Sequence, residues 1–147
     1  MKLFIFLLLI AAFLQTSFIS LNLCLIILIC RSYAIHQKEN YYLALFSGIF
    51  LGILSSANLG FWPLIMIGTV FIIHAIRLLP ITGRVLTIVP VALLVLFSAS
   101  GLEKLLLNTT FVWWQPILSA IIALPIFIVV REWEERLITK PGIKLKF

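Results

Sequence analysis

The amino-acid sequence predicts an all-α, polytopic integral membrane protein: a six-helix bundle with both termini in the cytoplasm. The first observation is composition, since 63% of the 147 residues are hydrophobic and only 11% are charged. A soluble domain has about 25% charged residues, so this chain has too few polar groups to cover its apolar residues in water. The second observation is a series of apolar runs close to membrane-spanning length, and the third is the distribution of positive charge. Together they predict a single transmembrane domain over residues 1–147.

Short polar segments divide this domain into its helices. The expected spans are residues 3–16, 20–33, 41–57, 62–79, 85–101 and 113–130, and residues 131–147 form a short basic cytoplasmic tail.

The division between the first two spans depends on a polar cluster. One continuous helix would place Gln15, Thr16 and Asn22 near the middle of the membrane, where their polar groups meet no water. A turn between two short helices places them at a membrane interface instead. We therefore favour six helices, and a bundle of five, with the first hairpin as one helix, remains the alternative.

The later boundaries follow from turn and charge signals. Segment 31–42 is polar and ends in two tyrosines, which is typical of the membrane surface. Segments 58–63 (NLGFWP) and 80–84 (PITGR) contain Gly and Pro, which favour turns. Segment 102–111 (LEKLLLNTTF) brings charge after an apolar run and is expected to be the last loop.

The positive charges give the orientation. With six spans and a cytoplasmic N-terminus, only Lys104 of the eleven Lys and Arg residues lies outside. The ten on the cytoplasmic side are Lys2, Arg31, Lys38, Arg77, Arg84, Arg131, Arg136, Lys140, Lys144 and Lys146. Such a bias is the positive-inside rule. Because these residues do not cluster on one face, the pI near 9.8 indicates contact with membrane lipid and no nucleic-acid partner.

The spans contain no catalytic constellation, so we expect no enzymatic activity, no metal and no cofactor. The sequence has no Asp, and all five Glu residues lie in expected loops or the tail. Cys24 and Cys30 are six residues apart, about 240° around a helix, and match no metal motif. His74 lies three residues before Arg77; it is either a proton or ligand contact or, as we expect, an imidazole hydrogen-bonded to a neighbouring helix.

Small residues recur at every fourth position: Gly48, Gly52, Ser56 and Gly60. Membrane helices associate through close van der Waals contact, which small residues allow. Gly60 is expected just beyond the helix end, in a turn. The stripe predicts close helix packing, either within this chain, with a partner or in a homo-oligomer.

Two further groups could contact other molecules. Gln15, Asn22 and Asn58 are expected to form a polar cluster at the outer face. Trp133 and Arg136 lie in the segment REWEER, which is either a docking helix for a cytoplasmic partner or the emerging end of the last helix, followed by a basic lipid anchor.

The layout resembles the bacterial rod-shape-determining MreD family. The matching motifs are Leu14-Gln15-Thr16-Ser17, the GxxxG segment from Gly48 to Ile53, and Leu59-Gly60. The resemblance implies a non-enzymatic scaffold of the cell-elongation complex in the bacterial cytoplasmic (inner) membrane, involved in cell shape and peptidoglycan synthesis. The implied partners are MreC, MreB and peptidoglycan-synthesis enzymes. Family members often have an Asp where this chain has Ser55-Ser56, so any role of that Asp is not carried over.

An alternative function uses the same architecture. The substrate-binding membrane subunits (S-components) of vitamin uptake transporters are also compact six-helix proteins. A pocket near Gln15, Asn22, Ser56 and Asn58 would then bind a small molecule at the outer face.

Overall fold

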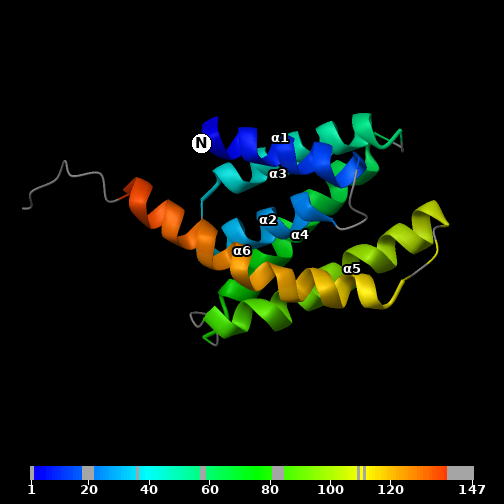
Figure 1. Ribbon diagram of the computed structural model, residues 1–147. Coiled ribbons are helices and arrows are strands. Elements are labelled where there is room, and N and C mark those ends of the chain that lie inside the picture. The colour runs from blue at the N-terminus through cyan, green and yellow to red at the C-terminus, as the bar shows by residue number, and fades with distance from the viewer. Residues whose placement is uncertain are drawn as a thin grey trace, which may run out of the picture.

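A computed structural model describes residues 2–17, 22–35, 37–56, 59–80, 85–108, 110 and 112–138. Within these ranges the chain forms six α-helices and no strands (Figure 1). The helices are α1 (Lys2–Ser17), α2 (Leu23–Ala34), α3 (Glu39–Leu54), α4 (Phe61–Arg77), α5 (Ile88–Leu107) and α6 (Trp114–Ile138), and a 3₁₀ turn, η1 (Val85–Thr87), precedes α5. The predicted all-α fold with six helices is confirmed, and α1 and α2 are separate helices.

The centre of the bundle is α2. This 12-residue helix contacts each of the other five helices, and residues 24–33 are all buried. Its neighbours surround it, as Figure 1 shows for α1, α3, α4 and α6. A helix that is buried on all sides needs no polar face, which explains its nearly continuous apolar sequence from Leu23 to Cys30.

Two helices extend further than the expected spans. The segment LEKLLL continues α5 to Leu107, because Leu, Glu and Lys all favour helix, and the helix ends at Asn108 with a left-handed φ of 51°. The first part of the expected tail continues α6 to Ile138, supported by an ion pair between Arg131 Nε and Glu135 Oε1 at 2.9 Å. The rest of that tail, residues 139–147, lies outside the described residues.

Two helical segments are long and apolar enough to cross a membrane: Val85–Leu106 and Trp114–Arg136. The other four helices are apolar but shorter, with 12 to 17 residues. At about 1.5 Å per residue they are about 18–26 Å long, against about 30 Å for a hydrocarbon core. The structure thus has two helices of spanning length and four shorter apolar ones.

Consecutive helices alternate in direction (Figure 1), so the ends of the helices gather at two opposite ends of the bundle. At one end, Arg31 contacts Phe4, Glu39 and Glu134. At the same end, the hydroxyl groups of Tyr33 and Thr87 form a hydrogen bond. We call this the basic end, because most of the described Lys and Arg residues belong to it. At the opposite end, which we call the polar-cavity end, Gln15, Asn22, Trp62, Glu103 and Gln115 line one cavity.

Candidate functional site

The first two residues of the small-residue stripe, Gly48 and Gly52, pack inside the chain, and the last two are exposed. A Cβ added at Gly48 would lie 2.4 Å from Pro63 Cα and 2.7 Å from Pro63 N, so the backbones of α3 and α4 are in contact there. A Cβ at Gly52 would lie 3.4 Å from Leu59 Cα, and one at Gly60 would meet nothing within 4 Å. Ser56 is exposed after the end of α3, with φ of 52°. Of the four residues, Gly48 is the one whose lack of a side chain the packing requires.

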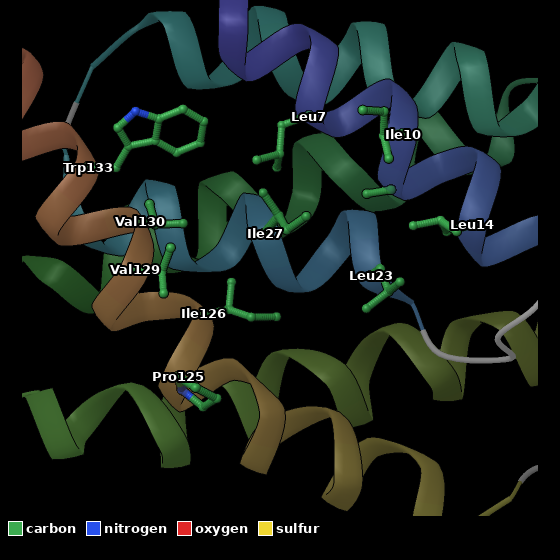
Figure 2. A pocket seen from close by; sticks show the side chains of 11 residues that line it. Leu7, Ile10, Leu14, Leu23, Ile27, Pro125, Ile126, Val129, Val130 and Trp133 are labelled. Atoms are coloured by element: carbon green, nitrogen blue, oxygen red, sulfur yellow. The ribbon is translucent and has the colours of Figure 1, made fainter.

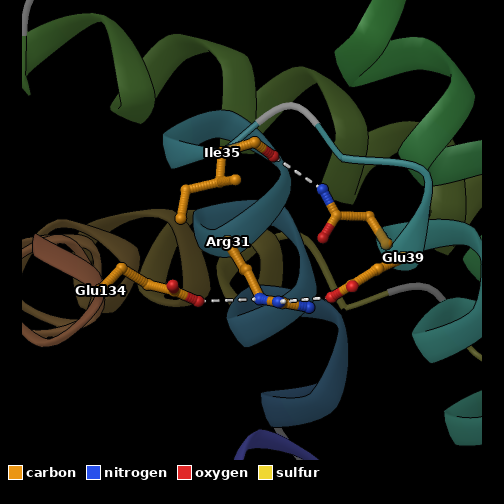
Figure 3. A network of polar contacts seen from close by, with 5 residues as sticks. Arg31, Ile35, Glu39 and Glu134 are labelled. Atoms are coloured by element: carbon orange, nitrogen blue, oxygen red, sulfur yellow. Dashed lines mark hydrogen bonds and ion pairs between the residues drawn. The ribbon is translucent and has the colours of Figure 1, made fainter. Parts of the chain in front are cut away.

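A buried arginine lies at the basic end (Figure 3). The Arg31 side chain is 4% exposed, and its Nε donates to Glu134 Oε1 at 3.0 Å. Its Nη2 lies 3.9 Å from Glu39 Oε2, and the guanidinium carbon is 4.5 Å from the centroid of the Phe4 ring. Arg31 therefore links α2 to α1, α3 and α6.

Some of the buried polar atoms at and around this arginine have no hydrogen-bond partner among the described residues. Arg31 Nη1 is buried without a hydrogen-bond partner among the described residues. Asn40 Nδ2 donates to the carbonyl oxygen of Ile35 at 2.7 Å and so holds the connection between α2 and α3. Because two carboxylates lie near one guanidinium, removing Glu134 would leave a buried charge with only a distant, half-exposed partner.

The two cysteines and His74 lie against neighbouring helices. Cys24 Sγ and Cys30 Sγ are buried and donate to the carbonyl oxygens of Leu8 and Ala123, both at 3.4 Å. The His74 ring is half-buried, with its centroid 6.4 Å from that of Tyr41 on α3. Among the described residues, no three His, Cys, Asp or Glu side chains form a group that could hold a metal ion.

The expected outer polar cluster is partly assembled. Gln15 Nε2 donates to Asn22 Oδ1 at 3.0 Å, and Gln15 Oε1 accepts from the Cys24 amide at 3.2 Å. Gln15 thus satisfies one of the free amides in the first turn of α2, as a capping residue does. Asn58 lies outside the described residues.

Gln15 and Asn22 line a cavity of about 260 Å³ at the polar-cavity end. Its walls come from α1 and from α3 to α6, and are formed by Gln15, Thr16, Asn22, Leu51, Ser55, Trp62, Glu103 and Gln115. Glu103, Gln115 and Trp62 were not predicted from the sequence to belong to this cluster. The alternation of helix direction could have indicated them, because it places the end of α5 and the start of α6 beside the end of α1 and the start of α2.

An apolar groove of about 400 Å³ opens on one flank of the bundle. As Figure 2 shows, Leu7, Ile10 and Leu14 of α1 face Ile126, Val129 and Trp133 of α6 across Leu23 and Ile27 of α2. Within the described residues, α1 and α6 both pack on α2 but not on each other. Every lining side chain except that of Trp133 is wholly aliphatic.

Both walls of this groove carry the spacing of a helix contact. On α1 the lining residues are 7, 10, 11 and 14, and on α6 they include 126, 129, 130 and 133. Each set follows i, i+3, i+4, i+7, which is one face of a helix over two turns. Of the expected docking pair, Trp133 lines the groove and Arg136 is exposed.

The chain matches no protein-family model, no curated protein and no solved structure.

Proposed function

We propose that the chain is a multi-pass protein of the bacterial cytoplasmic membrane and a non-enzymatic scaffold of the cell-elongation complex. The identity of the complex comes from the family resemblance. The observation that supports a scaffold function is the apolar groove between α1, α2 and α6. The groove is a helix-shaped surface that the described part of the chain leaves unfilled.

The membrane assignment is supported by the outer surface of the bundle. Large apolar side chains are exposed on every α-helix except the central α2, among them Phe6, Ile53, Phe71, Leu94 and Val129. In water such a surface would favour aggregation, whereas in lipid it has no such cost. The four short helices would require local thinning of the bilayer or water near their ends.

We assign the groove to a membrane-spanning helix of a partner protein, with MreC as the family-derived candidate. Two facing walls with i, i+3, i+4, i+7 spacing suit a third helix, since the same spacing mediates helix packing elsewhere. Pro125 adds a specific feature, because it has no amide hydrogen for the carbonyl oxygen of Ile121. A polar side chain of a partner helix could donate to that oxygen.

Filling the groove tests this function. Ile10→Trp and Val129→Trp place an indole between α1 and α6, and we expect each to reduce co-purification with MreC about tenfold, because overpacking costs about 1–3 kcal/mol. Cells that depend on the variant should lose their rod shape. Leu94→Trp is the matched control, because Leu94 is exposed on α5 away from the groove. Normal co-purification and cell shape with both groove variants would contradict the scaffold function.

A second candidate function is the substrate-binding subunit of a small-molecule uptake system. The cavity lined by Gln15, Asn22 and Glu103 favours it, because several polar groups converge there. The proposed orientation places this cavity on the outer side, where a nutrient would arrive. Binding of a small molecule in this cavity, measured on the purified chain, would support this candidate.

A further inference from the structure

Among the described residues that line the cavity at the polar-cavity end, Glu103 is the only ionisable one. Glu103 is half-buried on α5, and the other lining residues are neutral: Gln15, Thr16, Asn22, Leu51, Ser55, Trp62 and Gln115. Within the described part of the chain, no ion pair involves the Glu103 carboxylate. Transfer of a carboxylate out of water is unfavourable unless a positive group compensates it.

The chain supplies no such compensation in its described ranges. No Lys, Arg or His lines the cavity, and Arg31, Arg77 and Arg131 belong to the basic end of the bundle. Lys104 is the next residue along α5, which places it about 100° around the helix from Glu103, and it is exposed. The cavity therefore presents a negative charge that is complementary to a cation.

The neutral groups favour an organic cation over a metal ion. Hard metal ions need several oxygen ligands, usually more than one carboxylate, and Glu103 is the single carboxylate among the described lining residues. Trp62 and Leu51 supply apolar wall, and indole is the ring that attracts ammonium groups most strongly. The Trp62 Nε1–H is buried and has no hydrogen-bond partner among the described residues, so the site also holds an unsatisfied donor.

We propose that this cavity binds a small organic cation with an ammonium group near Glu103 and hydrogen-bonding groups near Gln15, Asn22, Ser55 and Gln115. The volume of about 260 Å³ is slightly below the range of about 300–1,000 Å³ for small-molecule sites. The ligand is therefore no larger than a simple amine or amino alcohol. This inference does not depend on the scaffold function, and it supplies the substrate class for the second candidate function.

Direct binding to the purified full chain tests the proposal. The probes are choline, ethanolamine and putrescine, measured by calorimetry and thermal shift in detergent. The control ligand is 3,3-dimethylbutan-1-ol, which has the shape of choline without its charge. We expect at least one ammonium probe to bind and to stabilise the protein, and the neutral alcohol to do neither.

Two variants locate the site. Glu103→Gln should weaken binding about tenfold or more, because it removes a charge-assisted contact while it keeps the shape. Ser55→Leu should also reduce binding, because the larger side chain would fill part of the cavity. Since Ser55 is exposed, this variant should fold, and it tests the site even if Glu103→Gln does not fold. Glu135→Gln, at the opposite end, should bind like the wild type. Absence of binding by all three cations, or binding unchanged by the cavity variants, would overturn the proposal.

Discussion

At the scale of single residues, Gly48 shows how the small-residue pattern acts. The stripe at positions 48, 52, 56 and 60 predicted close packing but could not distinguish an internal neighbour from a partner. At Gly48 the neighbour belongs to the same chain, because the backbone of Pro63 on α4 lies against it. Sequence spacing gives the face of a helix, whereas the identity of what lies against it depends on tertiary structure.

Gly48→Ala should destabilise the protein, because the new Cβ would meet the backbone of Pro63, which cannot rotate away as a side chain can. The expected cost is about 1–3 kcal/mol, the usual range for overpacking. Gly101→Ala is the matched control, since its Cβ meets nothing within 4 Å and Ala favours helix by up to about 1 kcal/mol. The measurement is the thermal midpoint of each purified variant. Equal midpoints for the two variants would contradict the close α3–α4 contact.

At the scale of helices, the polar and turn signals predicted how many elements the chain has, and the contacts between them were not predictable. Arg31 was assigned to a cytoplasmic segment because of its charge, yet it lies in the last turn of α2 and is buried. Its partner Glu134 is 103 residues away in sequence, so no local pattern indicates the pair. The convergence of Glu103 and Gln115 with Gln15 depends on the same long-range pairing of helix ends.

The Arg31–Glu134 pair should anchor the end of α6 to the bundle. Glu134→Ala leaves the guanidinium of Arg31 buried with only the half-exposed Glu39 nearby, and the expected cost is about 3 kcal/mol. Glu135→Ala removes an exposed i,i+4 pair with Arg131 and should cost about 0.5 kcal/mol or less. Denaturation of the two variants in detergent compares them directly. If Glu135→Ala were the more damaging of the two, the buried pair would not be the anchor.

At the scale of the whole molecule, composition and charge distribution predicted a helical membrane protein with one basic end. The all-helical fold is established, and two helices have membrane-spanning length. The expected spans 20–33, 41–57 and 62–79 are slightly longer than the helices α2, α3 and α4, and the difference is largest for α2, whose 12 residues pack among the other helices. Apart from Leu23 and Ile27 at the floor of the groove, this central helix is covered by protein, so its high hydropathy reflects burial among the other helices as readily as burial in a membrane.

The central claim is that all six helices are embedded in the membrane with the basic end in the cytoplasm, and sided cysteine labelling in intact cells tests it most directly. In a variant without Cys24 and Cys30, single cysteines replace Ser17, Ser55 and Thr110 at one end, and Lys38, Leu79 and Arg136 at the other; all six positions are exposed. The account predicts that an impermeant maleimide labels the first three in intact cells and the last three only after permeabilisation. If Ser17→Cys and Ser55→Cys stayed unlabelled from outside while Thr110→Cys reacted, only the α5–α6 hairpin would cross the membrane, and the six-span account would be wrong.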